Sequence, residues 1–232
     1  MKIFKEIREA LLHLIFPHLC EGCSNDLPDN AHFLCLQCLS VLPETSFHLY
    51  EENPVLHVFT GRIPVTYATA GFYFTKGAMI QHLLHQVKYK DHKDLGLYLG
   101  KLLGNMLSAS VHFQDVDLII PLPLFRAKER RRGYNQSDLI CEGVSKMFNR
   151  PVIKHAVKRI SDTESQTRKS RVERWENMEG QFEITDPEII RNKHILLVDD
   201  VLTTGATLEA CGRALLKGSN VKLSIAVLCV AT

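Results

Sequence analysis

Apolar residues follow two different spacings in the second half of the chain. The segments VDLIIP, PVIKHAV, ILLVDD and VKLSIAVLCVA are short and almost continuously apolar, as expected for strands that are buried on both faces of a parallel sheet. Between them, apolar residues recur at helical spacing over residues 135–148 and 204–217. This alternation of strands and helices predicts an α/β fold with a mostly parallel sheet flanked by helices.

The first half of the chain is less regular. The β-branched and aromatic residues of 65–74 predict a hairpin or strand pair, and apolar spacing predicts helices over residues 77–89 and 94–113. The polar, proline-containing residues 44–64 indicate a linker. We therefore predict two parts, a small amino-terminal module over residues 1–45 and a larger domain over residues 64–232. Gly218 is the expected carboxyl cap of the last helix.

The amino terminus has an amphipathic helical pattern, but Glu6, Arg8 and Glu9 interrupt any apolar core of the signal-peptide type. No stretch reaches the roughly 18 uninterrupted apolar residues of a membrane-spanning helix. We therefore expect a cytoplasmic protein that is not transmembrane. The first helix is expected to pack on the protein itself or on a partner, with a membrane surface as the less favoured alternative.

Composition limits the functional classes. The chain of 232 residues with 45% hydrophobic content is long enough for one α/β core and a small appendage. Its net charge of +2 is too small to indicate nucleic-acid binding by itself. Any surface for nucleic acid must therefore be local.

Four of the seven cysteines form two CxxC pairs near the amino terminus. Two such turns supply four thiolates for one tetrahedral zinc ion, and the predicted ligands are Cys20, Cys23, Cys35 and Cys38. Four unbound thiols or a redox pair of the thioredoxin type are the alternatives, but no βα pattern follows the cysteines. A shell closed by four thiolates leaves no position for a substrate, so the predicted zinc is structural.

A second group of polar residues follows the predicted strand at 195–198. Asp199 and Asp200 end this strand, and the following helix begins within the segment Val201, Leu202, Thr203, Thr204, Gly205, Ala206 and Thr207. The amino end of a helix and the threonine hydroxyls suit a phosphate, and the aspartates suit the hydroxyls of a ribose. The alternative is a helix cap beside a core strand. The chain contains neither a Walker loop nor a GxGxxG fingerprint.

Two further segments are strongly basic. The first, a predicted loop after VDLIIPLPLF, carries Arg126, Lys128, Arg130, Arg131 and Arg132 and is followed by Tyr134. These cations suit a pyrophosphate or a nucleic-acid backbone, and Tyr134 suits stacking on an unpaired base; a solvated face is the alternative. The second segment contains Arg168, Lys169, Arg171, Arg174 and Trp175.

VDDVLTTGAT resembles the phosphoribosyl pyrophosphate signature of the type I phosphoribosyltransferases. Together with the double CxxC, HQVKYKDHKDLG, PLPLFRAKERRRGYNQSDL and QTRKSRVERWENMEGQF, it makes the chain similar to the competence protein F (ComF/ComFC) family, over nearly the whole length. This family resembles amidophosphoribosyltransferases with an added zinc finger.

The resemblance implies a type I phosphoribosyltransferase fold, which is Rossmann-like, with Asp199 and Asp200 on the ribose and residues 203–207 on its 5-phosphate. It implies a pyrophosphate and its Mg²⁺ near Leu122 and Pro123, and it adds Lys88 to the candidates for pyrophosphate or nucleic acid. It also implies that the segment with Arg168, Lys169 and Arg171 is a lid.

Two functions follow from this resemblance. The first is a protein that binds phosphoribosyl pyrophosphate or a related nucleotide and serves the uptake of single-stranded DNA with other competence proteins. The alternative is an active phosphoribosyltransferase in nucleotide synthesis or salvage, in which Asp199 and Asp200 are the catalytic pair. The sequence names no acceptor base or amine.

Overall fold

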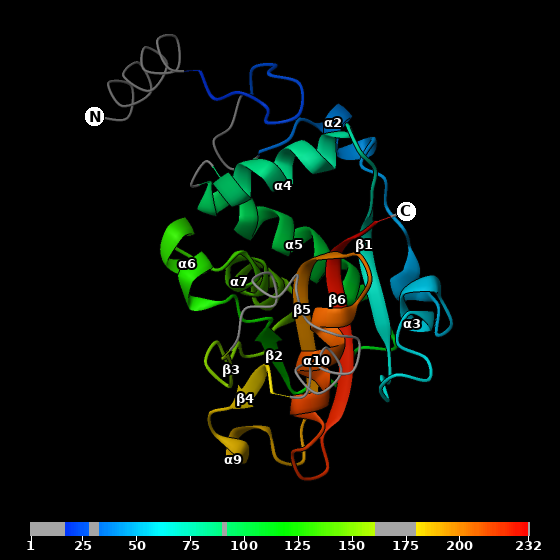
Figure 1. Ribbon diagram of the computed structural model, residues 1–232. Helices are drawn as coiled ribbons and strands as arrows, with labels where there is room; N and C mark the ends of the chain where they lie inside the picture. The colour runs from blue at the N-terminus through cyan, green and yellow to red at the C-terminus, as the bar shows by residue number, and fades with distance from the viewer. Residues whose placement is uncertain (1–16, 28–32, 90–91, 161–179, 232) are drawn as a thin grey trace, which may run out of the picture.

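The computed structural model describes residues 17–27, 33–89, 92–160 and 180–231 (Figure 1). The helix predicted at the amino terminus lies outside these residues. Among the described helices, none combines the length and the apolar character that a membrane span requires.

The centre of the fold is a four-stranded sheet in the order β1-β6-β5-β2. All neighbouring strands are parallel, which confirms the predicted parallel sheet. The strands are β1 (Ala68–Phe74), β2 (Leu118–Pro121), β5 (His194–Leu202) and β6 (Lys222–Ala231). Because the strands are parallel, their carboxyl ends meet at one edge of the sheet, where ligands bind in open α/β folds.

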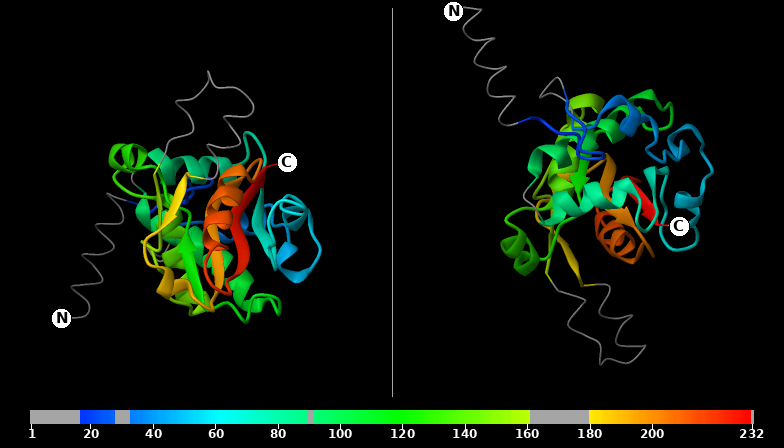
Figure 2. Two further views of the ribbon diagram at one scale, coloured as in Figure 1. Left: turned by 60° about the horizontal axis from the view of Figure 1, so that its bottom comes forward. Right: turned by 90° about the horizontal axis from the view of Figure 1, so that it is seen from above.

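Helices cover both faces of this sheet. On one face lie α4 (Met79–Tyr89), α5 (Lys93–Ala109) and α7 (Gln136–Phe148), and on the other lies α10 (Ala206–Leu215). Figure 2 shows the orange α10 on the opposite side of the strands from the green α7. Alternate residues of β5 enter the two cores: Leu196 and Val198 pack with α4, α5 and α7, whereas Ile195 and Leu197 pack with α10. Burial on both faces explains the continuous apolar runs in the sequence.

Helices α5 and α7 cross in close contact. A Cβ atom at Gly100 would fall on the carbonyl oxygen of Ile140, and one at Gly143 would fall on that of Leu97. The two backbones therefore meet without intervening side chains. This contact fixes the amino end of α7 beside the carboxyl ends of β2 and β5.

Several sequence predictions were wrong in detail. Within residues 65–74, where a hairpin or strand pair was expected, only the single strand β1 (Ala68–Phe74) forms, and it pairs with β6. In PVIKHAV, only an isolated bridge between Val152 and Ile119 touches the main sheet. The chain then forms β3 (Val157–Arg159), which pairs antiparallel with β4 (Phe182–Ile184). Gly218 is not the carboxyl cap of α10, because the cap is Leu216 and Gly218 does not adopt a left-handed conformation. The residue with a positive φ after this helix is Asn220, with φ 54°.

The basic segment after β2 is also not a loop. It forms the short helix α6 (Arg126–Arg132), which buries none of its residues. Arginine and lysine favour helix intrinsically, but a helix without an apolar face leaves no periodic signal in the sequence. Gly133 ends α6 in a left-handed conformation with φ 82°.

Residues 44–64 are packed rather than an open linker. They contain η1 (Phe47–Leu49) and α3 (Pro54–His57), and Val55 and Phe59 are fully buried against the α10 side of the sheet. Asn53 caps α3 and also donates to the carbonyl of Ala68 in β1 over 2.9 Å. The remaining short helices are α2 (Leu36–Ser40) and α9 (Pro187–Ile190).

Candidate functional site

The four predicted cysteine ligands gather at one point. The sulfur atoms of Cys20, Cys23, Cys35 and Cys38 all lie within 4.8 Å of one another. The Sγ atoms of Cys23 and Cys35 are 3.8 Å apart, which matches two corners of a tetrahedron with metal–sulfur bonds of about 2.3 Å. The cluster therefore fits a zinc site.

Main-chain amides surround these sulfurs. The N–H of Cys35 donates to Sγ of Cys20 over 3.2 Å, and the N–H of Cys38 donates to Sγ of Cys35 over 3.4 Å. Burial raises the pKa of Cys20, but amides of Cys35, Gly22 and Cys23 outweigh this effect and lower the pKa to about 6. Such amides favour the thiolate, which is the form that binds metal.

The cysteine cluster is docked on α4. Cys20, Cys38, Leu27 and Leu34 belong to the same buried cluster as Ile80 and Leu83 of this helix. Glu21, inside the first CxxC turn, accepts a hydrogen bond of 2.6 Å from Nε2 of Gln86 on α4. Gln86 is itself almost fully buried. The first CxxC turn thus packs on the helix that ends at Tyr89.

The other predicted site lies at the carboxyl end of β5. This strand includes Asp199 and Asp200 and extends to Leu202, and α10 begins at Ala206, two residues later than predicted. Between them, Thr203 and Thr204 are exposed. Gly205 has φ +76°, and a Cβ atom there would lie 2.7 Å from Cγ1 of Val58. Glycine is therefore required both by the backbone conformation and by the packing.

The loop encloses a small pocket of about 40 Å³, which is room for about three water molecules. Its lining comprises Asp199, Val201, Leu202, Thr203, Thr204, Gly205, Ala206, Thr207 and Leu208. The hydroxyl of Thr204 accepts the N–H of Ala206 over 3.5 Å. Because the first amides of a helix have no partner within the helix, the start of α10 faces this pocket with hydrogen-bond donors and a positive dipole end.

The two aspartates have different partners. Oδ1 of Asp199 accepts a hydrogen bond of 3.0 Å from the hydroxyl of Ser137, at the start of α7. Burial raises the pKa of Asp199 to about 7, and the charge of Asp200 acts in the same direction, while Ser137 and Lys88 oppose them. No local pattern in the sequence predicts the contact with Ser137.

Asp200 forms an ion pair with Lys88. The distance from Nζ of Lys88 to Oδ2 of Asp200 is 2.6 Å, and both side chains are largely buried. Lys88 is near the carboxyl end of α4, the helix that carries the cysteine cluster. The structure therefore places this predicted residue beside the aspartates.

The turn after β2 closes the same edge. The N–H of Leu122 donates to the carbonyl of Val198 over 2.8 Å, and Pro123 has no N–H. Neither Leu122 nor Pro123 therefore offers a free backbone N–H to a pyrophosphate. Asn135, the amino cap of α7, donates to the carbonyl of Leu122 over 3.0 Å and so ties the turn to α7.

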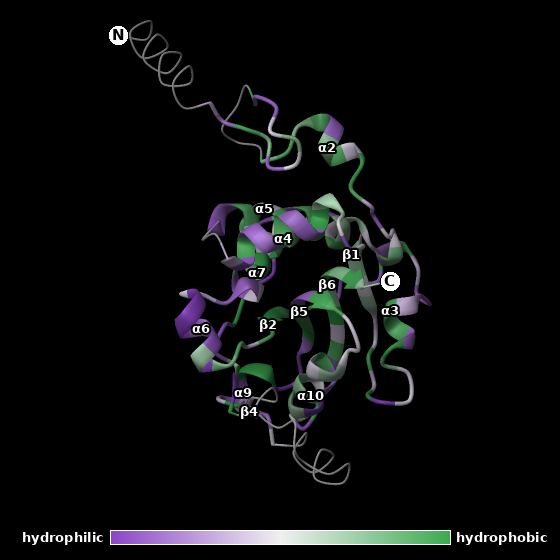
Figure 3. Ribbon diagram, turned by 45° about the horizontal axis from the view of Figure 1, so that its top comes forward, coloured by the Kyte–Doolittle hydropathy of each residue, from purple (hydrophilic) through white to green (hydrophobic). Residues whose placement is uncertain are grey.

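Helix α6 follows this turn and is hydrophilic apart from Ala127, so that it is mostly purple in Figure 3. Arg126, Arg130 and Arg131 are exposed. Arg132 instead donates to Oε1 of Gln136 over 2.7 Å, and its guanidinium lies over the ring of Tyr89, 5.5 Å from the centroid.

Two tyrosines accompany these cations. The ring of Tyr89 is 61% exposed, whereas the hydroxyl of Tyr134 donates to the carbonyl of Val87. Nζ of Lys93 lies 5.2 Å from the centre of the Tyr134 ring. The rings and cations thus form a mixed surface next to the carboxyl end of α4.

Arg62 also contacts the loop after β5. Its guanidinium donates to the carbonyl of Thr204 over 3.1 Å and lies 3.6 Å from the carboxylate of Glu209. Arg62 belongs to the segment interpreted as a linker, so no local pattern marked it. Arg168, Lys169, Arg171, Arg174 and Trp175, which include the predicted lid cations, lie outside the described residues.

Comparisons with known proteins agree with this architecture. The model of the phosphoribosyl transferase domain matches residues 145–232, the part of the chain that contains β5, α10 and β6. DNA utilization protein YhgH of Shigella flexneri is 32% identical over 150 residues, which cover 63% of this chain and 65% of that protein. Competence protein F of Haemophilus influenzae is 35% identical over 142 residues, covering 58% and 61% respectively.

A longer match covers most of the chain. Competence protein ComFC of Bacillus subtilis is 33% identical over 216 residues, which cover 92% of this chain and 78% of that protein. The parallel sheet and the domain match give the chain a type I phosphoribosyltransferase fold. With a match over most of both chains, this protein belongs to the competence protein F (ComF/ComFC) family.

Proposed function

We propose that the chain binds phosphoribosyl pyrophosphate with Mg²⁺ at the carboxyl end of β5 and uses this site in the handling of single-stranded DNA. The observation that carries the proposal is the ion pair of Lys88 with Asp200, next to Asp199 and the loop of Thr203 to Thr207. Paired acids suit a sugar, and the start of a helix suits a phosphate. Both features lie within one short segment.

The 5-phosphate is assigned to the pocket formed by the loop. The first residues of α10 line this pocket, and the first amides of a helix lack partners within the helix, so they can donate to a phosphate together with the hydroxyls of Thr203, Thr204 and Thr207. Gly205 allows the loop to turn tightly enough for this. The loop thus supplies neutral donors and a dipole rather than a fixed cation.

The ribose and the metal are assigned to the aspartates. Carboxylate oxygens accept hydrogen bonds from vicinal hydroxyls, and they are also the ligands that Mg²⁺ prefers. Lys88 neutralises Asp200, which limits the repulsion between these acids and a phosphorylated ligand. Bound Mg²⁺ would add positive charge at the pyrophosphate. We assign to Leu122 and Pro123 the role of shaping the turn, and to Arg126 and Arg130 to Arg132 the attraction of the pyrophosphate or of DNA.

The role in DNA handling rests on the names of the relatives and on α6. One group of relatives is named for DNA utilization and two others for competence. The exposed arginines of α6 and the ring of Tyr89 combine backbone charge with a stacking face, as single-stranded nucleic acid requires. We place this activity in the cytoplasm, in contact with other competence proteins.

Two parts would share this work. Residues 1–45 would hold a structural zinc ion and provide a surface for DNA or protein, and residues 64–232 would form the phosphoribosyltransferase-like domain. The packing of the cysteine cluster on α4 supports a structural role, because the helix that carries Lys88 is held by this cluster.

Phosphoribosyl pyrophosphate binding is tested by calorimetry with Mg²⁺ and the full chain. We expect saturable binding that Asp199→Asn together with Asp200→Asn weakens at least tenfold, because amides cannot replace two charged acceptors. Asp186→Asn, in the cap of α9 at the opposite edge, is the matched control and should bind as the original chain does. Equal affinity in the double variant would contradict the assignment.

The alternative function, phosphoribosyl transfer, is distinguished from binding alone by measuring the release of pyrophosphate. The anomeric carbon would be attacked by an acceptor while pyrophosphate departs with its electron pair, and the raised pKa of Asp199 and the nearby cations favour such chemistry. Release that depends on an added base or amine and is lost in the aspartate variants would make the chain an enzyme. Binding without release across the acceptor set supports the accessory role.

Zinc is tested by metal analysis of the purified chain. We expect one zinc ion per chain, and we expect Cys35→Ser to remove it and lower Tm by several degrees, because α4 loses a docked neighbour. Cys211→Ala removes one buried thiol elsewhere and should leave the zinc content unchanged. Retention of zinc by the Cys35 variant would contradict the four-cysteine assignment.

DNA binding is tested with a labelled single-stranded oligonucleotide at several salt concentrations. Arg130→Gln with Arg131→Gln should weaken binding and reduce the slope of log K against log salt by about 1.4, since each phosphate contact contributes about 0.7. Lys193→Gln with Lys222→Gln removes two cations at the amino edge of the sheet and should leave the slope unchanged. Equal effects of both pairs would indicate binding without a defined surface.

A further inference from the structure

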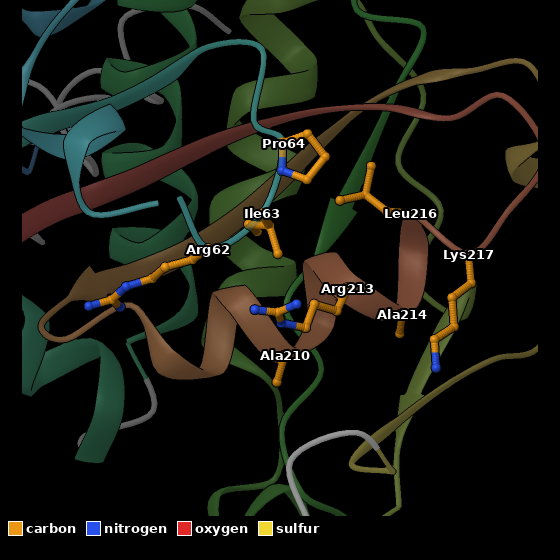
Figure 4. A pocket seen from close by; sticks show the side chains of 8 residues that line it. All are labelled: Arg62, Ile63, Pro64, Ala210, Arg213, Ala214, Leu216 and Lys217. Carbon is orange, nitrogen blue, oxygen red and sulfur yellow. The ribbon is translucent and has the colours of Figure 1, made fainter. Parts of the chain in front are cut away.

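Arg62 reaches from the segment before β1 to the loop after β5. One of its terminal nitrogens, Nη1, donates to the carbonyl oxygen of Thr204 over 3.1 Å. Figure 4 shows this side chain extending from residues 62–64 toward the turn between β5 and α10. Thr204 and Gly205 line the phosphate pocket, but Arg62 is not part of its lining. The guanidinium therefore approaches the loop from outside the pocket.

This contact fixes the direction of one backbone N–H. The peptide bond between Thr204 and Gly205 is trans, so its C=O and its N–H point in opposite directions. Because the carbonyl of Thr204 faces Arg62, the N–H of Gly205 is directed away from Arg62, toward the pocket. In the part of the chain that the structure describes, no group accepts this N–H. It is therefore a donor that an anion in the pocket can use.

The loop sequence does not fix this direction by itself. A half-turn of the peptide changes only ψ of Thr204 and φ of Gly205, and glycine adopts φ of either sign about equally readily. Gly205 is the amino cap of α10, and no side chain caps the helix there. After a half-turn, the carbonyl of Thr204 would face the pocket and repel a phosphate. A group outside the loop has to select the orientation with φ +76°.

Arg62 is itself held in position. Its neighbours Phe59 and Ile63 are buried, and its own N–H donates to the carbonyl of Phe59 over 2.9 Å. Its guanidinium lies 3.6 Å from the carboxylate of Glu209 on α10. Glu209 therefore offsets the charge of Arg62. What Arg62 supplies to the loop is a directed hydrogen bond rather than an unpaired positive charge.

The same segment also packs behind the loop. A Cβ atom at Gly205 would lie 2.7 Å from Cγ1 of Val58 and 3.2 Å from Cε1 of Phe59. The loop therefore cannot move toward residues 58–62, and Arg62 holds the carbonyl on that side. The match to the phosphoribosyl transferase domain covers residues 145–232. This support for the loop thus comes from a part of the chain that precedes the matched region.

We propose that Arg62 is a positioning residue for the phosphate: it orients the peptide between Thr204 and Gly205 so that the N–H of Gly205 faces the pocket. Arg62 acts through this peptide and does not itself touch the ligand. The inference rests on the proposed function, because the anion that it serves is the 5-phosphate of a ribose.

The orientation is tested first in the free chain, by the residual dipolar coupling of the Gly205 N–H bond. We expect Arg62→Ala to change this coupling, because the carbonyl of Thr204 loses its donor. Arg213→Ala is the matched control, since Arg213 also pairs with Glu209 and is 45% exposed, compared with 47% for Arg62. It should leave the coupling as in the original chain. An unchanged coupling in the Arg62 variant, or the same change in both variants, would overturn the proposal.

The consequence for binding is measured by calorimetry with ribose 5-phosphate and Mg²⁺. Arg62→Ala should weaken binding about fivefold, as expected for the loss of about one hydrogen bond, and Arg213→Ala should not. The two variants should have similar Tm values. Equal affinity in both variants contradicts the proposal, and so does a much lower Tm in the Arg62 variant, which would make Arg62 a support of the fold. If the original chain does not bind ribose 5-phosphate, the proposed function fails, and the dipolar coupling alone decides whether Arg62 orients the peptide.

Discussion

The ion pair between Lys88 and Asp200 is the contact on which the rest of the proposed site depends. Two carboxylates stand next to each other at the end of β5, beside a loop suited to a phosphate, so that acids and ligand would repel one another. Lys88 offsets the charge of Asp200. Burial raises the pKa of Asp199 to about 7, which favours its neutral form and so weakens its repulsion of a phosphate. The site can therefore accept an anion although it is built around acids.

The position of Lys88 depends in turn on the cysteine cluster. Glu21 and the buried cysteines pack on α4, and this helix ends with Lys88 and Tyr89 at the edge of the sheet. Tyr134 adds a hydrogen bond to the carbonyl of Val87 from the other side. A metal in the cluster would thus stabilise the far end of α4 through packing, so the cysteine cluster and the proposed phosphoribosyl site are connected through this helix.

The sequence predicted the features that arise from local patterns. Runs of apolar residues marked strands buried on both faces, and the acids followed by threonines and a glycine marked the loop after β5. Contacts between distant segments left no such signal. Ser137 and Arg62 reach the site because α7 and residues 62–64 are brought there by packing, including the close crossing at Gly143. Helix α6 was taken for a loop because it has no buried face.

At the carboxyl edge of the sheet, two acids lie beside the first residues of α10, and this is the proposed anion site. Hydrogen exchange of the backbone amides, measured with ribose 5-phosphate and Mg²⁺ added to the full chain, tests this site. We expect slower exchange at residues 204–208. A sugar phosphate that binds while these amides exchange at their original rates would contradict it.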